Sequence, residues 1–347
     1  MSDPSLPQAR KGLSCLWIAL AIFAGGTLLT TVLCCGTISW FTRAPRGSAA
    51  SREPFSYAQV PLPSFPPDRG EPIRTKDDAT ISRYEILLGE QGGYYEKPGV
   101  GGRLWVYVPP GKHPPRSLAC VLMAPDRYSP LVGTALNELD EDKQIPYVKA
   151  GYVVVAYEID GRNDAEFSDD VGHKRQFEAF KNSCGGVVNA RNALEYALHR
   201  IPEVNPRKVY AYGMGFGGTT ALLFAAHEPR LAGVLALEPI VDTPANLGAV
   251  ILRAGSVNQP DLVDFATQNS PHTHVARVKC PVFLFFEDEK LPLIAPQIPQ
   301  AKVFVNQLKK AGTDATLTIV EAEFNGRKDE GIPPSIEWLK KQVELNN

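Results

Sequence analysis

A glycine-rich turn between an expected strand and an expected apolar helix constrains this chain more than any other feature. Residues 208–212 have the composition of a buried strand, and residues 219–227 are apolar nearly all round, as in a buried helix. Gly213, Gly215 and Gly217 lie between them. Alternate glycines allow the backbone to turn sharply and let the helix approach the strand closely. The turn therefore predicts a strand-to-helix unit within an α/β fold.

The rest of the chain from about residue 80 alternates strand-like and helix-like runs. Most of the expected strands are continuous apolar runs, which are typical of parallel strands covered on both faces. This alternation predicts a mostly parallel, doubly wound sheet. Strands are expected at residues 103–108, 118–123, 152–157, 208–212, 233–237, 282–286 and 316–320, and helices within residues 133–150 and at 176–200, 219–227, 299–311 and 332–345.

The first 76 residues differ in composition from the rest. No charged residue occurs between Lys11 and Arg43, and residues 13–41 are dominated by Leu, Ile, Ala, Val, Trp and Phe. A membrane-spanning helix needs about 20 apolar residues, whereas the apolar region of a cleaved signal peptide is only about 7–15 residues long. We therefore predict an uncleaved transmembrane helix at 13–41 that follows a short tail, residues 1–12. The basic residues on its two sides nearly balance, so they do not set its orientation.

Proline dominates the segment that follows. Residues 42–76 contain seven prolines, which disfavour both helix and sheet, so we expect an extended linker to a domain at residues 77–347. A net charge of −2 gives no basic face for nucleic acid. The six cysteines lack the spacing of a metal site or a disulfide framework, and His272 and His274 have no evident third ligand. The sequence predicts no cofactor and no metal.

The sequence around the glycine-rich turn follows a family pattern. Residues 187–218, VVNARNALEYALHRIPEVNPRKVYAYGMGFGG, run through a helix, an Asn-Pro turn, a strand and a G-x-G-x-G-G turn. This order resembles the α/β-hydrolase superfamily, and in particular its prolyl-oligopeptidase (peptidase S9) and dienelactone-hydrolase-like branch, where the turn reads G-x-S-x-G-G. Residues 270–285 match the run before the acid-bearing loop of that branch, and residues 336–340 match its closing helix. The resemblance implies an α/β-hydrolase fold over residues 100–345.

The catalytic triad of the resembled family is degenerate in this chain. The nucleophile position is Gly215, which has no atom that can attack a carbonyl. The acid position falls on Glu289, with Asp288 as the alternative. No histidine follows His274, so the base position holds Glu323 or a neighbour. The resemblance therefore implies a serine-hydrolase scaffold in which two of the three catalytic roles are unfilled.

The resemblance also implies where an oxyanion hole would lie. The first donor would be the backbone N–H of Phe216, directly after the nucleophile position. The second would come from the loop that begins at Ala124, which contains Pro125 and Asp126. Pro125 has no N–H, and Asp126 brings negative charge to the place of the oxyanion. This loop argues against a working hole.

Two other chemistries stay open at this point. Cys184 lies near the start of an expected helix and could act as a nucleophile, although a buried structural cysteine is the favoured interpretation. Glu289, Glu323 and Asp126 could converge to bind Ca²⁺ or Mg²⁺, although ordinary surface ion pairs are favoured.

The combined pattern predicts a membrane-anchored pseudo-hydrolase. Its N-terminal helix would contact membrane lipid, and its vestigial cleft would bind a small-molecule or protein ligand. The joint absence of serine and histidine in otherwise family-like surroundings supports this hypothesis. The alternative is an ester or peptide hydrolase with non-standard catalytic residues.

Overall fold

The computed structural model describes residues 60–76, 78, 80–89, 102–126, 131–162, 170–246, 262–288, 297–321 and 330–346. All of them belong to one compact unit, residues 55–347. The predicted tail at 1–12 and transmembrane helix at 13–41 lie outside the described residues. Within the described part of the chain, no helix is long and apolar enough to cross a membrane.

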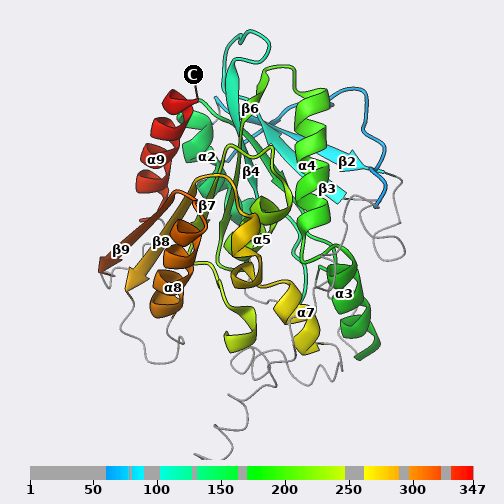
Figure 1. Cartoon of the computed structure of the whole chain (residues 1–347). Helices are drawn as coiled ribbons and strands as arrows, with labels where there is room; N and C mark the ends of the chain where they lie inside the picture. Colours follow the sequence, from blue (N-terminus) through cyan, green and yellow to red (C-terminus); the bar gives the residue numbers. More distant parts are fainter. Residues whose placement is uncertain are drawn as a thin grey trace, which may run out of the picture. The chain divides into compact units, whose positions relative to one another are not determined.

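A nine-stranded sheet forms the centre of the domain, in the order β1-β2-β3-β5-β4-β6-β7-β8-β9 (Figure 1). The first three pairings along this order are antiparallel and the remaining five are parallel, which confirms the predicted mostly parallel sheet. The strands are β1 (Ile73–Arg74), β2 (Ser82–Leu88), β3 (Gly102–Tyr107), β4 (Leu118–Met123), β5 (Val153–Tyr157), β6 (Val204–Met214), β7 (Gly233–Leu237), β8 (Val282–Asp288) and β9 (Ala315–Glu321).

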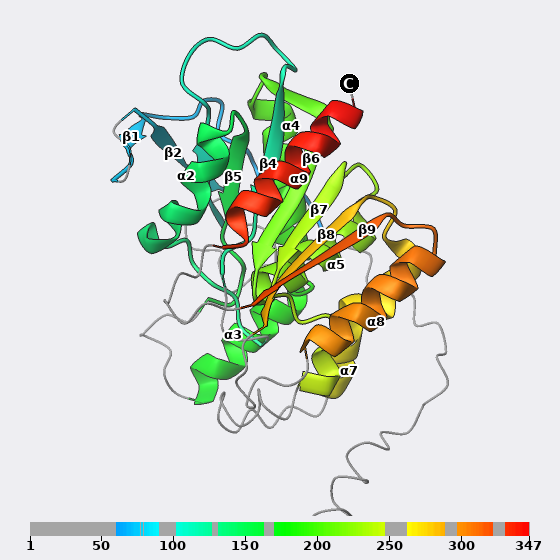
Figure 2. The same cartoon turned by 90° about the vertical axis from the view of Figure 1, so that its left-hand side faces the viewer.

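Helices cover both faces of the sheet, and each face has its own core (Figures 1 and 2). Successive strand residues point to opposite faces, so Val121 packs in the core beneath α2 and α9 while its neighbour Leu122 packs in the core beneath α4 and α5. The helices are α2 (Glu141–Lys149), α3 (Asp170–Asn182), α4 (Val187–Arg200), α5 (Phe216–His227), α7 (Leu262–Gln268), α8 (Gln297–Lys310) and α9 (Ile332–Leu345), with 3₁₀ turns at Glu138–Asp140 and Pro271–Arg277.

The helical pattern expected at residues 176–200 is divided in the structure. α3 ends at Asn182 and α4 begins at Val187. Between them, Cys184, Gly185 and Gly186 all have positive φ, at 55°, 65° and 94°. Left-handed residues end a helix, and the two consecutive glycines adopt this conformation without steric cost. The apolar periodicity continues across the break, so it could not reveal the division.

Part of the proline-rich segment that the sequence assigns to a linker packs on the domain. Arg191 Nη1 of α4 donates a hydrogen bond to the carbonyl of Val60 at 2.8 Å. Phe65 stacks edge-on against Tyr196, with ring centroids 5.8 Å apart. Farther along, Arg69 pairs with Glu203 at 2.6 Å. Residues 60–69 contain no helix or strand, as the prolines predict. Arginine side chains nevertheless donate hydrogen bonds to some of the backbone carbonyl groups of this segment and hold the segment against α4.

Candidate functional site

The turn between β6 and α5 has the backbone geometry of a nucleophile elbow. Gly215, at its apex, has φ 55° and ψ −128°, a combination that side-chain-bearing residues adopt only under strain. Its N–H donates to the carbonyl of Leu237 on β7 at 2.9 Å, and its carbonyl accepts from Thr219 N–H of α5 at 3.2 Å. Gly215 and Phe216 are half-buried. The structure therefore places residue 215 at the apex of the turn, with no side chain on it.

Close backbone contacts explain the other glycines of the turn. A Cβ on Gly213 would lie 2.2 Å from the carbonyl carbon of Gly217. A Cβ on Gly217 would lie 2.4 Å from the carbonyl oxygen of Pro125. Both distances are well below van der Waals contact, and the opposing atoms are backbone atoms. The turn can therefore bring α5 against β6 and the loop after β4 only because these two residues have no side chain.

An ion pair neutralises Asp126 in the expected oxyanion loop. Lys143 of α2 lies 3.2 Å from an Asp126 carboxylate oxygen and 3.3 Å from one of Asp140. Burial disfavours the charged ammonium, but the two carboxylates outweigh burial and raise the pKa of Lys143 above its usual value. The Asp126 side chain thus has a cationic partner, in agreement with the ion pairing that the sequence favoured for this carboxylate.

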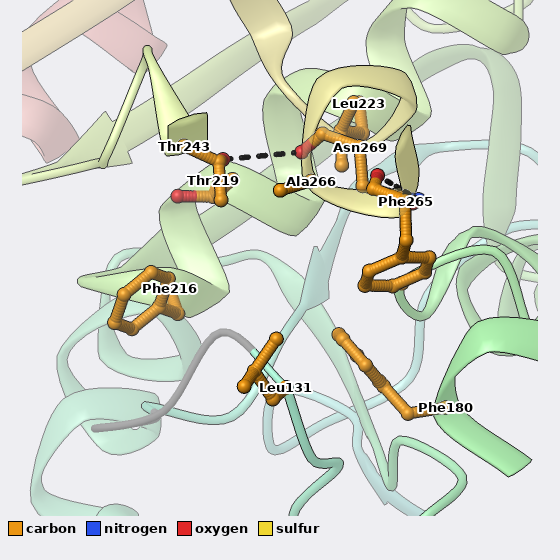
Figure 3. A pocket seen from close by; sticks show the side chains of 10 residues that line it. Leu131, Phe180, Phe216, Thr219, Leu223, Thr243, Phe265, Ala266 and Asn269 are labelled. Atoms are coloured by element: carbon orange, nitrogen blue, oxygen red, sulfur yellow. Dashed lines mark hydrogen bonds between the residues drawn. The ribbon is translucent and has the colours of Figure 1, made fainter. Parts of the chain in front are cut away.

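A small apolar cavity lies beside the first two turns of α5 (Figure 3). Its volume is about 10 Å³, which is about the room that one water needs. Thr243 Oγ1 closes one wall by donating to the carbonyl of Asn269 at 3.3 Å. The lining includes Leu131, Phe180, Phe216, Leu223 and Phe265. The ring of Phe216 therefore lies in an apolar pocket too small for a substrate.

The remaining predicted triad positions, Glu289 and Glu323, lie outside the described residues. Asp288, the alternative acid, ends β8 and is paired in register with Glu321 of β9. Among the described residues, no three His, Cys, Asp or Glu side chains are close enough together to hold a metal ion. The convergence of Glu289 and Glu323 with Asp126 stays a prediction, because two of its three residues lie outside the described part of the chain.

The other candidate residues have structural roles. Burial raises the pKa of the Cys184 thiol above its usual value, and a thiol kept neutral is a poor nucleophile. His274 lies in the 3₁₀ turn, forms a hydrogen bond with the carbonyl of Gln268 at 2.7 Å and makes an edge-to-face contact with His227, with ring centroids 5.1 Å apart. His272 and His274, which have no evident third metal ligand in the sequence, thus lie in a 3₁₀ turn in which His274 contacts its neighbours.

Glu158, which sequence analysis missed, follows the last residue of β5. Its side chain is 2% exposed, and its Oε1 accepts from the N–H of Leu136 at 3.4 Å. Arg162 Nη1 lies 3.7 Å from the same oxygen, and Oε2 has no hydrogen-bond partner among the described residues. Burial raises the pKa of Glu158 to about 7. The signal available in the sequence was its place directly after a buried strand, where parallel strands present their functional edge.

Glu238 was also missed and follows β7 in the same way. It has φ 49° although it carries a side chain, and its N–H donates to the carbonyl of Phe285 at 2.7 Å. The residue before it, Leu237, accepts the hydrogen bond from Gly215. Positive φ at a residue with a side chain is uncommon and is frequent at functional sites. A carboxylate on a strained backbone therefore lies next to the elbow.

The fold and the elbow agree with the comparison to sequence families. The model of the dienelactone hydrolase family matches residues 121–323, which is more than half of the chain. This chain belongs to the dienelactone hydrolase family. The match includes the end of β4, the elbow and β8, the elements that hold the predicted site. No curated protein matches the sequence.

Solved structures with this fold include esterases and peptidases. The acetyl xylan esterase of Paenibacillus sp. R4 superposes with a TM-score of 0.55 at 13% identity, over 82% of this chain and 90% of the esterase. A putative dienelactone hydrolase of Klebsiella pneumoniae gives 0.53 at 15% identity, over 75% and 99% of the two chains. The acylaminoacyl peptidase of Pyrococcus horikoshii gives 0.53 at 15% identity, over 76% of this chain but 47% of the peptidase. These similarities establish an α/β-hydrolase fold of the type that the sequence predicted.

Proposed function

We propose that this chain is a membrane-anchored pseudo-hydrolase of the dienelactone hydrolase family, which binds a small-molecule or protein ligand in the vestigial cleft and does not form an acyl-enzyme. The observation that carries the proposal is the glycine at the elbow apex, in the backbone conformation that positions a nucleophile. Acyl transfer by this fold needs a nucleophilic side chain at that atom position. Without it, the elbow can only bind.

The described neighbours of the elbow do not replace the missing nucleophile. Met214 is buried in the core beneath α2 and α9. Phe216 faces the small cavity beside α5, and the Cys184 thiol has a raised pKa. The anchoring part of the proposal depends on the uncharged run at residues 13–41.

A labelling experiment tests the loss of acyl transfer. The full chain, purified in detergent, is treated with a fluorophosphonate probe and with short p-nitrophenyl esters. We expect no labelling and no hydrolysis above the buffer rate. The double substitution Gly215→Ser with Glu323→His is expected to regain labelling, whereas its matched control, Gly215→Ala with Glu323→His, is not. Labelling or turnover by the unmodified chain that disappears in Cys184→Ala or Glu323→Gln would contradict the proposal.

The strained backbone of Glu238 favours a second candidate function, an ester or peptide hydrolase with non-standard catalytic residues. A carboxylate beside the elbow could act as a general base on a water that attacks the carbonyl directly, without an acyl-enzyme. This function requires ester turnover without probe labelling. Turnover should then fall at least 100-fold in Glu238→Gln, while Asp242→Gln, farther along the same loop, should leave it unchanged.

A further inference from the structure

The two edges of the sheet differ in how their backbone is protected. At the β2 edge, β1 pairs with the start of the strand, and Gly89 N–H, just after its end, donates to the carbonyl of Ser64. This edge also carries the charged residues Arg83 and Glu85. Covering segments and charges are the usual means of preventing edge-to-edge pairing. β9, at the opposite edge, has no charge before Glu321 and no proline or glycine.

The outer side of β9 offers a regular row of backbone groups. β9 pairs only with β8 among the described strands, and Figure 1 shows it at the margin of the sheet. Val282 N–H of β8 donates to the carbonyl of Asp314 at 2.8 Å. Backbone groups alternate in direction along a strand, so residues 316, 318 and 320 face β8 and residues 315, 317, 319 and 321 face outward. Thr316 to Glu321 are all at least partly exposed.

We propose that β9 pairs with β9 of a second copy of this chain, antiparallel about a two-fold axis through Thr318. In this register Ala315 lies opposite Glu321 of the copy, Thr316 opposite Val320, Leu317 opposite Ile319, and Thr318 opposite itself. Every outward-facing residue then belongs to a hydrogen-bonded pair. The two strands exchange about eight backbone hydrogen bonds, so that every outward-facing N–H and C=O group of β9 has a partner.

The side chains match across the same register. Leu317 and Ile319 pack against the core beneath α8, whereas Val320 packs against the core on the opposite face. The Leu317–Ile319 pairs therefore meet on one face, and the Thr318–Thr318 and Thr316–Val320 pairs meet on the other. Thr–Thr and β-branched cross-strand pairs stabilise antiparallel sheets.

Charge complementarity favours a copy of this chain in the antiparallel orientation. Glu321 ends β9, and α8 ends in the exposed Lys309 and Lys310 shortly before β9 begins. None of these three side chains forms an ion pair with a described residue. Antiparallel pairing brings Glu321 of each chain toward the lysines of the other, whereas parallel pairing would place the two Glu321 carboxylates side by side, which is destabilising.

Sedimentation of the full chain in detergent tests the dimer. We expect the unmodified chain to sediment with twice the polypeptide mass. Thr318→Lys places two like charges opposite each other at the axis, and the dissociation constant should rise at least about tenfold. The matched control is Leu87→Lys on the β2 edge, where Leu87 is 46% exposed; it should leave the dissociation constant unchanged.

Disulfide formation tests the register. In a chain with Cys15, Cys34 and Cys35 replaced by serine, Thr318→Cys should form an interchain disulfide on mild oxidation, because facing residues of a non-hydrogen-bonded pair have Cα atoms about 4.5 Å apart. Thr316→Cys should not, since the two copies of residue 316 would be about 13 Å apart. Thr318→Cys nearly conserves the volume of the side chain. It therefore tests the interface even if the Thr318→Lys variant does not fold.

Three results would overturn the proposal. The first is that the unmodified chain sediments as a monomer at 100-fold the concentration needed for its detection. The β9 edge would then have to pair with another segment or with another protein. The second is a dimer that survives Thr318→Lys in a chain with unchanged circular dichroism. The third is a cross-link that forms as readily through residue 316 as through residue 318.

Discussion

β5 and β6, the two strands on either side of β4, end in opposite ways. β6 ends in a turn with the backbone geometry of a catalytic elbow and no side chain at its apex, Gly215. β5 ends at Tyr157 and is followed by Glu158, a buried carboxyl whose pKa is raised to about 7 and which has no place in the predicted triad. The apex of the elbow and the end of β5, after which Glu158 lies, are thus separated by two strand spacings, about 10 Å.

The comparison shows that backbone geometry and side-chain chemistry depend on different interactions. Backbone contacts around Gly213 and Gly217, and the hydrogen bond from Gly215 N–H to Leu237, hold the elbow. None of these interactions needs a side chain at residue 215, so the turn keeps its shape without a nucleophile. Glu158 has its raised pKa because its carboxyl is buried, which outweighs the hydrogen bond from Leu136 N–H, and not because of backbone conformation.

The largest expected effect is on the elbow. Gly213→Ala places a Cβ 2.2 Å from the backbone of Gly217, so α5 must move away from β6. We expect the free energy of unfolding to fall by about 3 kcal/mol or more, measured by urea titration with circular dichroism. In the control Gly218→Ala, the new Cβ meets its nearest atom, the carbonyl oxygen of Gly213, only at 3.0 Å, and the loss should be smaller. A smaller loss for Gly213→Ala than for the control would contradict the contact.

The next effect concerns the end of β5 and depends on pH. The folded pKa of Glu158 lies above the ordinary carboxyl value of 4.5, so the folded state holds the proton longer than the unfolded state. The contribution of this carboxyl to stability is complete below pH 4.5 and is lost as the pH rises through 7. The full loss is at most about 3 kcal/mol.

Glu158→Gln removes this pH dependence. We expect the variant to unfold at a higher urea concentration than the parent at pH 8, and at a similar or lower one at pH 4.5. Taking the difference between the two proteins cancels the other titrating groups, including His227, whose pKa burial lowers to about 4. If the difference did not change with pH, Glu158 would not titrate near neutrality.

Gly215→Ala tests the backbone conformation at the apex of the elbow. Because residue 215 has φ 55° and ψ −128°, any side chain there adds backbone strain of about 1–3 kcal/mol. Urea titration should show this loss with unchanged helix content. A variant as stable as the parent would show that the apex does not adopt this conformation in solution.

The smallest effect is expected in the loop that follows β4, where Lys143 of α2 contacts Asp126. Lys143→Met leaves Asp126 and Asp140 without their shared cation, and we expect a loss of about 1 kcal/mol. The control Lys149→Met removes a more exposed partner of Asp78, which it contacts at 3.0 Å, and should lower the stability less, because exposed ion pairs contribute little. Thermal denaturation of both variants at low and high salt would check the difference, because salt screens the exposed pair more strongly.

Periodicity and glycine spacing were enough to predict most of the fold. The apolar runs at 118–123 and 233–237 are strands with those bounds, and the closing helix spans Ile332–Leu345 as expected. Continuous hydrophobicity is a local property that follows from burial on both faces of a sheet. The division of the 176–200 pattern into α3 and α4 was not predictable in this way, because apolar spacing continues through the left-handed turn at Cys184.

The sequence alone determined that residue 215 has no nucleophilic atom, because the identity of a side chain does not depend on folding. It also determined that a strand, a tight turn and a buried helix meet there. Only the tertiary structure decided that Lys143 neutralises Asp126, that Glu158 is buried enough to titrate near neutrality, and that Glu238 is strained beside the elbow. These properties arise from residues distant in the chain and from the exclusion of water, which no local pattern records.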